Sequence, residues 1–356
     1  MASRKLLLVG NPTAQSGKNA ERIERATSLF RARGITPELI TTEPEGRTIP
    51  KIVQRLHAHE PMTLVSMGGD GTFAEVARAL YASGRSEEVP LAMLPTGTAN
   101  DQGKSFGLDA EEAALERNIE VVLEARETRL DVGHLRTFDV LGAQVAEELF
   151  FDSAGWGISP RTLQLRNEDR AAIAQVPILR AVYRDQLVYA GALLRTFLSS
   201  YVEEQKFDVE IEADGQYRVI TGLTDLVVKG TRIYGGMWVC DEAARHDDGR
   251  FEIVPFQGKR DWISKALVML KGSKLDLASL SKIGLQHSEG LSASRMRLHI
   301  KPRPGGTPVV AQLDGDVFES TADIRIDVIP RALRLVVPRD HADERRQASV
   351  KPDQIK

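Results

Sequence analysis

The sequence predicts two domains, an α/β domain followed by a β-sandwich domain, and three observations support this prediction. Strand-like and helix-like segments alternate in the first third of the chain, which is typical of a mainly parallel sheet with helices on both faces. From about Asp131, short apolar runs separated by Gly, Pro or Asp turns dominate, which is typical of an antiparallel sandwich. With 356 residues, the chain is long enough for two domains that each have a core.

The α/β domain is expected to contain four short apolar strands and three helices whose apolar side chains recur every three or four residues. The strands are expected over residues 5–9, 38–42, 63–67 and 91–94. The helices are expected over residues 20–33, 49–56 and 73–81, and Gly34 provides the stop signal for the first of them.

The second domain is expected to consist mainly of strands, interrupted by helical insertions at about 169–202 and 260–270. The strand-like runs cover residues 150–151, 225–228, 251–256, 296–300, 309–313 and 324–329. We therefore expect an α/β domain over residues 1–130 and a sandwich over 131–325. The polar segment 341–356 is expected to be a disordered tail.

Composition excludes several classes of protein. The formal net charge of -3 argues against binding to nucleic acid through bulk positive charge. The single cysteine, Cys240, cannot form an internal disulfide or a cysteine-based zinc site. The sequence also lacks about 18 uncharged apolar residues in a row, so we expect a cytoplasmic protein whose contact with the inner membrane face, if it makes one, is peripheral.

Three loops rich in Gly, Thr and Asn each follow a predicted strand of the α/β domain. In an open parallel sheet, ligands bind beyond the carboxyl ends of the strands, so these loops are expected to share one edge. The first loop, residues 11–19, offers backbone N–H groups at the start of a helix, which suits an anion. It lacks the Walker A spacing, and taken alone it is better explained as an ordinary turn between a strand and a helix.

The second loop is Gly68-Gly69-Asp70-Gly71-Thr72, and its glycines allow a close approach of backbone to a ligand. Asp70 would repel a phosphate unless Mg²⁺ lies between them or Asp70 removes a proton during phosphoryl transfer. The structural alternative is a helix cap. The third loop, residues 95–101, supplies two hydroxyls, an amide and a carboxylate, so the three loops together favour a nucleotide site.

Several motifs resemble the diacylglycerol-kinase catalytic domain, a family that includes YegS-like lipid kinases and sphingosine and ceramide kinases. The main matches are Gly68–Thr72 followed by Glu75-Val76, and the P-x-G-T-x-N-D motif at residues 95–101. Weaker matches extend the resemblance over nearly the whole chain, at residues 129–131, 234–237, 247–249 and 313–316.

The resemblance implies a fold like that of NAD kinases and diacylglycerol kinases, in which a nucleotide-binding α/β domain precedes a β-sandwich that binds the lipid. The last strand, about 326–340, is then expected to return to the first domain. The implied reaction transfers the γ-phosphoryl group of ATP to a lipid hydroxyl with Mg²⁺. The implied ATP contacts are Asn11, Thr13, Thr42, Gly68, Gly69, Gly71, Thr72, Thr98 and Asn100. The carboxylates implied for Mg²⁺ and the lipid headgroup are Asp70, Asp101 and Asp131.

The chain departs from the family at positions that bear on the chemistry. The family has a D-G-E motif with a catalytic base, but this chain has Asp314-Gly315-Asp316, which leaves Asp316, Asp314 and Asp70 as candidate bases. Asp152 stands where the family usually has Asn, and the first loop carries two additional residues, Ala14 and Gln15. Some relatives also hold a structural metal, for which the matching groups are the carbonyls of Arg245 and Arg250 and the side chain of Asp248.

The sequence leaves some alternatives open. An NAD-kinase-type enzyme shares the glycine loop, and the Asp at position 316 is compatible with a weakened member that only binds nucleotide or lipid. A lipid substrate at the membrane surface is the expected partner, a homodimer is compatible with the sequence, and no nucleic-acid partner is expected. Residues 178–198 fit either a core helix with a basic face or a membrane-facing amphipathic helix.

Overall fold

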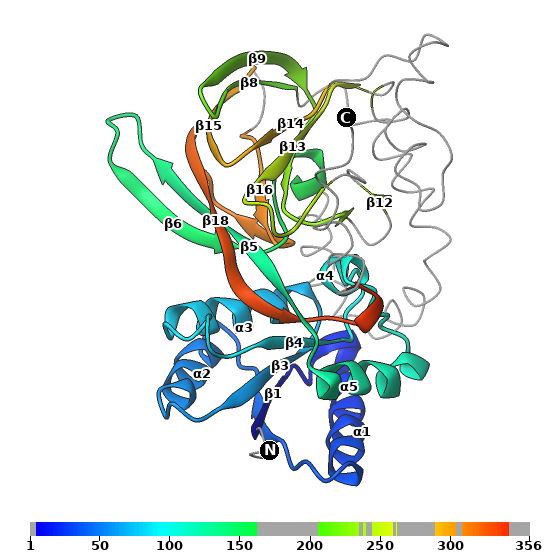
Figure 1. The fold of residues 1–356 in the computed structure, drawn as a ribbon. Coiled ribbons are helices and arrows are strands. Elements are labelled where there is room, and N and C mark those ends of the chain that lie inside the picture. Colours follow the sequence, from blue (N-terminus) through cyan, green and yellow to red (C-terminus); the bar gives the residue numbers. More distant parts are fainter. Residues whose placement is uncertain are drawn as a thin grey trace, which may run out of the picture.

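The computed structural model describes residues 5–161, 206–234, 238–239, 244–258, 261, 289–303 and 308–341 (Figure 1). The predicted helical insertion at 169–202, including the amphipathic segment 178–198, lies outside these residues. Only residue 261 of the insertion predicted over 260–270 is described.

The α/β domain is built on a parallel sheet with helices on both faces, as predicted. Its strands are neighbours in the order β2 (Glu38–Thr41), β1 (Lys5–Gly10), β3 (Met62–Gly68) and β4 (Leu91–Pro95). The helices are α1 (Asn19–Ala32), α2 (Thr48–Leu56), α3 (Asp70–Ala82), α4 (Asp101–Ser105) and α5 (Leu115–Glu124), with short 3-10 turns at Ala14–Gly17 and Glu112–Ala114.

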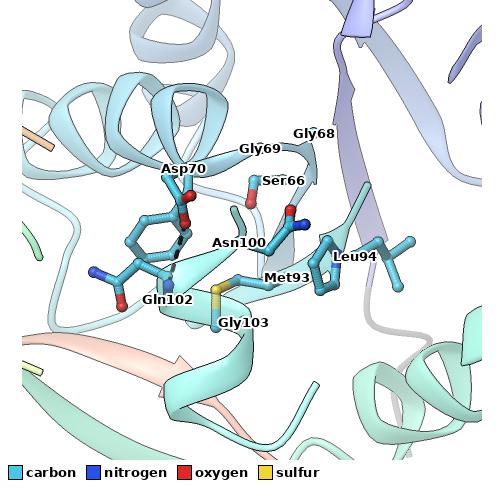
Figure 2. Close-up of a pocket in the computed structure, with 11 residues that line it drawn as sticks. Ser66, Gly68, Gly69, Asp70, Met93, Leu94, Asn100, Gln102 and Gly103 are labelled. Carbon is cyan, nitrogen blue, oxygen red and sulfur yellow. Dashed lines mark hydrogen bonds between the residues drawn. The ribbon is translucent and has the colours of Figure 1, made fainter. Parts of the chain in front are cut away.

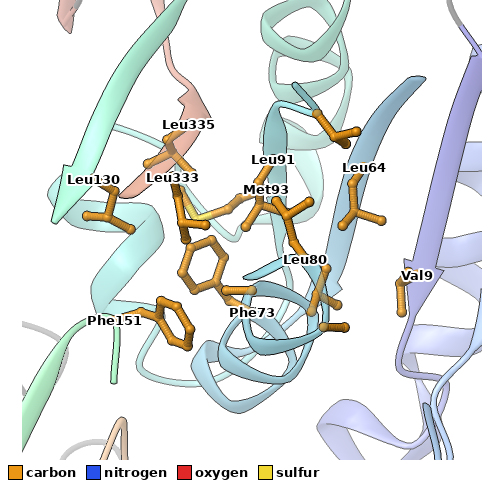
Figure 3. Packing of buried hydrophobic residues seen from close by; sticks show 14 of the residues in the cluster. Val9, Leu64, Phe73, Leu80, Leu91, Met93, Leu130, Phe151, Leu333 and Leu335 are labelled. Atoms are coloured by element: carbon orange, nitrogen blue, oxygen red, sulfur yellow. The ribbon is translucent and has the colours of Figure 1, made fainter. Parts of the chain in front are cut away.

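Apolar side chains on the two faces of this sheet form two separate cores. One core packs α2 and α3 against the sheet, with Phe73, Leu80 and Leu91 among its buried residues (Figure 3). The other packs α1 and α5 against the opposite face, through side chains such as Phe30 and Ile119. Burial on both faces explains why β3 is buried along its whole length.

The second domain is a sandwich of antiparallel strands. One layer contains β5 (Glu127–Phe138), β6 (Gln144–Phe150), β8 (Phe207–Ala213), β9 (Gln216–Leu223), β15 (Arg295–Pro302) and β18 (Asp323–Val336). The other layer has the order β14 (Leu291–Ala293), β13 (Phe251–Phe256), β10 (Asp225–Lys229), β7 (Ser153–Gly157), β16 (Ala311–Leu313) and β17 (Asp316–Phe318). A core that includes Trp156, Phe207 and Phe251 fills the space between the layers. A separate pair, β11 (Ile233–Tyr234) and β12 (Trp238–Val239), completes the described strands.

Two strands pass from one domain into the other, so the predicted borders fall inside strands. The border after residue 130 lies within β5, and the border after residue 325 lies within β18. The first part of β18 pairs with β5 and β15, and near its end Leu335 lies beside Leu91 of β4 in a parallel arrangement. One ten-stranded sheet therefore runs through both domains.

The segment 341–356, predicted to be a disordered tail, has one described residue. The ring of His341 packs edge-on against Phe106, with 5.3 Å between the ring centroids. The remainder of the segment lies outside the described residues. Within the part of the chain that the structure describes, no helix is long and apolar enough to cross a membrane.

Candidate active site

The three predicted loops meet at the carboxyl ends of β1, β3 and β4, which are adjacent strands. The side-chain amide of Asn11 donates to the Thr72 hydroxyl at 3.2 Å, which joins the first loop to the second. The N–H of Thr96 donates to the carbonyl of Gly68 at 2.7 Å, which joins the second loop to the third. Thr42 lies at the same edge, where its N–H donates to the carbonyl of Gly10 at 2.9 Å.

Contacts within and between these loops leave no room for a side chain at Gly68 and Gly97. A Cβ atom on Gly97 would lie 2.4 Å from the Cα atom of Gly69, so the two backbones touch. A Cβ atom on Gly68 would overlap the side chain of Thr72 at 2.3 Å. By contrast, a Cβ atom on Gly71 would have only Asp316 near it, at 3.7 Å. Loop packing thus gives a structural reason for Gly68 and Gly69, while the contact of all three glycines with ATP stays a prediction.

A small hollow lies between the second and third loops (Figure 2). Its walls include Ser66, Gly69, Asp70, Asn100 and Gln102. The hollow has room for about one water molecule before it opens to the surface. A phosphate group or a nucleotide would therefore extend beyond it.

Asp70 is the first residue of α3, and its carboxylate is held by the start of α4. The N–H of Gln102 donates to Asp70 Oδ1 at 3.1 Å. Burial raises the pKa of Asp70, and the negative charge of Asp152 raises it further. The backbone N–H groups of Gln102 and Asp101 and the positive charge of Lys229 act in the opposite direction. Asp101 itself is buried at the first position of α4.

The other residues predicted to contact ATP divide into two groups. Thr13 and Thr98 are exposed at the edge of the site. Asn11 and Asn100 are held by hydrogen bonds of their side chains. Besides its bond to Thr72, Asn11 accepts both the N–H and the hydroxyl of Thr13 through Oδ1. Asn100 has a left-handed backbone with φ of 52°. Its side-chain oxygen accepts the N–H of Gly97, and its side-chain NH₂ donates to the carbonyl of Gly97, both at 2.8 Å. This side chain therefore closes the third loop.

The structure distinguishes the two aspartates of the Asp314-Gly315-Asp316 segment. The buried carboxylate of Asp314 accepts the N–H groups of residues 151–153 at distances of 2.8 to 3.2 Å. Burial raises its pKa to about 7, although the positive charge of Arg78 opposes the rise. Asp314 therefore builds the turn at 151–153, and its oxygens are already engaged by backbone, which argues against its predicted role as base.

Asp316 lies on β17 with its carboxylate over Gly71 of the second loop. The residue as a whole is exposed. The protein around its carboxylate nevertheless raises its pKa, and Arg78 on α3 opposes the rise. Asp316 is thus the candidate base that the sandwich domain places beside the second loop.

Asp131 has a different set of contacts from Asp70. Its carboxylate accepts the N–H of Gly249 at 2.7 Å and that of Arg331 at 2.6 Å. Burial raises its pKa to about 6, and the charges of Asp248 and Asp247 add to the rise. Asp131 therefore ties β5 to the 247–249 turn and to β18.

The groups proposed for a structural metal lie around the 247–249 turn. Asp248 Oδ1 accepts the N–H of Arg250 at 3.1 Å, and the side chain of Arg245 lies 3.7 Å from Asp247. Within the described ranges, no three His, Cys, Asp or Glu side chains gather in a way that could hold a metal ion. The structural metal at Arg245, Asp248 and Arg250 stays a prediction.

Sequence reasoning missed Arg78, Gln102 and Lys229, three residues that shape the site, because their partners lie far away along the chain. Arg78 on α3 donates to the carbonyl of Leu149 at 3.2 Å and lies 3.9 Å from Asp314. Gln102 donates to the carbonyl of Phe151 at 2.5 Å. Asp152 forms a buried ion pair with Lys229 at 2.6 Å. The one signal in the sequence was Asp152 itself, which departs from the usual Asn.

Comparisons with known proteins find similar sequences over part of the chain and over nearly all of it. Residues 5–135 match the model of the diacylglycerol kinase catalytic domain. The chain is 25% identical to a protein of Pseudomonas putida named "Probable lipid kinase YegS-like", over 95% of this chain and 97% of that protein. A relative of the same name from Pseudomonas aeruginosa is 26% identical over 90% of this chain and 92% of its own length.

Solved structures share the fold. A diacylglycerol kinase from Bacillus anthracis superposes with a TM-score of 0.64 at 18% identity, covering 96% of this chain and 99% of that one. Yeast NADH kinase superposes with a TM-score of 0.50 at 11% identity, covering 99% and 89%. The predicted fold class is therefore confirmed. Over residues 5–135 the chain is similar to the diacylglycerol kinase catalytic domain, and over nearly its whole length it is similar to proteins named as probable YegS-like lipid kinases, as its motifs predict.

Proposed function

We propose that this protein transfers the γ-phosphoryl group of ATP to the hydroxyl of a lipid, with Mg²⁺ as cofactor. One observation carries the proposal: the contacting loops of β3 and β4 hold Asp70 at their junction, while Asp316 from the sandwich domain faces Gly71 of the same junction. Nucleotide loops and a candidate base from the other domain thus meet at one place. The lipid kinases among its relatives support the same chemistry.

The residues at the junction suit magnesium and phosphate. Carboxylate oxygens are the donors that Mg²⁺ prefers, and it usually takes one or two of them together with phosphate oxygens and water. Asp70 and Asp101 would supply them here. Bound Mg²⁺ would neutralise charge on the phosphates. The protein's own part is to hold Asp70 through the N–H groups of α4 and to offer backbone N–H groups at the start of α3.

We assign the removal of the hydroxyl proton to Asp316. A base must be able to reach the proton that it abstracts. Asp316 is exposed beside the second loop, whereas Asp314 is buried and engaged with three backbone N–H groups. The positive charge of Arg78, which lowers the pKa of both carboxyls, would favour the ionised form of Asp316 that a base requires.

A lipid substrate requires contact with a membrane surface, and the β5–β6 hairpin supports such a contact. The hairpin projects from the sandwich (Figure 1). Its tip carries Val140 and Leu141, which are 97% and 89% exposed. Strand β6 leads from this tip directly to the turn at 151–153 beside the active site.

The test is transfer of labelled phosphate from ATP to a panel of acceptors. The panel contains diacylglycerol, phosphatidylglycerol, a sphingoid base and ceramide in mixed micelles, with NAD in solution as the competing acceptor. We expect a labelled lipid product that requires Mg²⁺. Label on NAD alone, or on no acceptor, would contradict the proposal.

A variant pair makes the test specific to the site. Asp70→Asn should lower kcat by about 100-fold or more while the protein stays folded, because the developing charge loses its organising carboxylate. Asp109→Asn is the matched control, since Asp109 lies on the surface in an exposed ion pair with Arg117. Full activity in the Asp70→Asn variant would remove Asp70 from the mechanism.

A further inference from the structure

A lysine ammonium group is fully buried beside the candidate active site. Lys229 has no exposed surface, and its Nζ atom donates to Asp152 at 2.6 Å and to the Thr231 hydroxyl at 3.1 Å. The Thr231 hydroxyl in turn donates to the same oxygen of Asp152. Lysine is almost never fully buried without a partner, because desolvation of the charge is costly. These three side chains form a closed polar triangle, the Lys229 triangle.

The Lys229 triangle lies where the two domains meet. Lys229 is the last residue of β10 and is paired with Ser153 of β7, so it reaches Asp152 across the ladder. On the side of the α/β domain, Ser105 at the end of α4 donates to the Thr231 hydroxyl at 3.4 Å. The Ser105 hydroxyl also accepts the N–H of Ile233 at 3.0 Å. The triangle thus connects the second sheet of the sandwich to α4.

The turn at 151–153 transmits this connection to the reacting groups. Its carbonyl at Phe151 accepts the side-chain amide of Gln102, and the backbone N–H of Gln102 holds Asp70. Its three N–H groups hold Asp314, two residues before Asp316. A displacement of this turn would therefore move the proposed magnesium ligand and the proposed base together.

We propose that Lys229 is a positioning residue for phosphoryl transfer: through Asp152 and Thr231 it fixes the 151–153 turn against α4 and so aligns Asp70 with Asp316. This inference rests on the proposed function. It also accounts for the departure at position 152. An aspartate buried here beside Asp70 and Asp314 needs a counter-charge, and Lys229 supplies it from the neighbouring strand.

The test uses two double variants of the full chain, because a single change leaves a buried unpaired charge and can prevent folding. Lys229→Met with Asp152→Asn removes both charges and the lysine's hydrogen bonds. Lys229→Gln with Asp152→Asn removes the charges but keeps a donor at position 229. Arg85→Met is the matched control. Arg85 is a buried cation in the α/β domain that bonds to the carbonyls of Leu56 and Glu60.

We expect the Met-containing variant to fold with a Tm near that of the wild type, since the removal of both partners of a buried pair is often nearly neutral. Its kcat should fall by about 10- to 100-fold, the effect of a small misplacement of reacting groups, with KM for ATP unchanged. The Gln-containing variant should recover most of the lost kcat. The Arg85→Met control should lower Tm without a comparable loss of kcat. Full kcat in the Met-containing variant would overturn the proposal.

Hydrogen exchange decides the inference even if no lipid in the panel is phosphorylated. In the Met-containing variant, amide exchange should accelerate in peptides that cover residues 101–105 and 151–153, and the Gln-containing variant should restore the protection. Unchanged exchange in these peptides would overturn the positioning role. An inactive wild type with the expected exchange pattern would contradict the proposed function but support the link between the domains.

Discussion

Aspartates at the domain junction differ in role because their surroundings differ. Asp70 and Asp314 both accept backbone N–H groups, yet Asp70 lines an open hollow and Asp314 is enclosed. Asp316, two residues further on, is exposed and faces the glycine loop. Identical side chains in one motif therefore serve as a scaffold and as a candidate base. Their replacement should separate stability from activity.

We predict that Asp316→Asn lowers kcat by about 100-fold or more and leaves stability nearly unchanged, because a general base contributes roughly 10²–10⁴ to the rate. Asp314→Asn should destabilise the fold by about 1–3 kcal/mol, because its amide NH₂ would oppose the backbone N–H groups of the 151–153 turn. Urea denaturation and lipid phosphorylation measured on both variants test the pair. The reverse pattern, with activity lost only in the stable Asp314 variant, would move the base to Asp314.

A second prediction concerns Asp225, a buried residue at the start of β10. Its carboxyl accepts the N–H of Ser159 at 3.2 Å and also bonds the Ser159 hydroxyl. Burial raises its pKa to about 8. Because the folded pKa exceeds the unfolded one, the folded state binds this proton more tightly. The stability that this tighter proton binding provides is complete below about pH 4 and is lost as the pH rises through about 8.

Asp225→Asn should remove this pH dependence. Between about pH 5 and about pH 8, the wild type should lose on the order of 4 kcal/mol more unfolding free energy than the variant. Asp131 and Asp314 also have raised pKa values, but they are present in both proteins and cancel in the difference. Urea unfolding of both proteins at the two pH values measures this difference in unfolding free energy. An equal loss of unfolding free energy in the wild type and the variant would contradict a raised pKa at Asp225.

At the scale of elements, apolar periodicity predicted the parallel strands and their helices because each element buries its own face. The same rule could have found β8, where alternate residues of Phe207–Ala213 are buried, and α5, which buries Leu115, Ile119 and Val122. The glycine and P-x-G-T-x-N-D motifs located the loops. The Asp152–Lys229 pair could not be predicted, because the two residues are 77 positions apart and meet only when β7 pairs with β10.

The contact between the second and third loops gives a prediction at this scale. Gly97→Ala should destabilise the protein by about 1–3 kcal/mol, since the new methyl group would press on the backbone of Gly69. Gly71→Ala should be neutral or stabilise the protein by up to about 1 kcal/mol, because the position is exposed within α3 and has room for a Cβ atom. Thermal unfolding of the two variants provides the measurement. Equal effects would mean that the loops are not in close contact.

At the scale of the whole molecule, the two domains are parts of one sheet, so the site cannot open by a free hinge at 130 or 325. Strand β18 contributes Leu333 and Leu335 to the core of the α/β domain and Ile324 and Ile326 to the core of the sandwich. The same sheet carries the β5–β6 hairpin as a fixed extension. If the hairpin contacts a membrane as proposed, the orientation of the active site relative to that membrane is fixed by the same sheet.

Two features of the hairpin tip would suit the proposed bilayer contact. Asp139 organises the turn: its N–H donates to the carbonyl of Ala143, and its carboxylate accepts the N–H groups of Leu141 and Ala143. With these backbone groups bonded, Val140 and Leu141 can enter an apolar phase at low cost. Together with Val145, which is 59% exposed, they amount to three side chains. A protein interface needs roughly 20–30 residues from each partner, so a lipid surface is the better match.

We predict that Val140→Asp combined with Leu141→Asp lowers binding to phosphatidylglycerol vesicles at least about 10-fold, because each buried apolar side chain contributes roughly 1.5–3 kcal/mol. Activity on diacylglycerol in vesicles should fall in parallel, while activity on a short-chain soluble diacylglycerol should stay unchanged. Leu39→Asp is the control, since Leu39 is a half-exposed apolar residue on β2 of the other domain. Vesicle sedimentation measures binding, and the two assays measure activity. Unchanged sedimentation of the double variant would contradict a membrane contact at the hairpin tip.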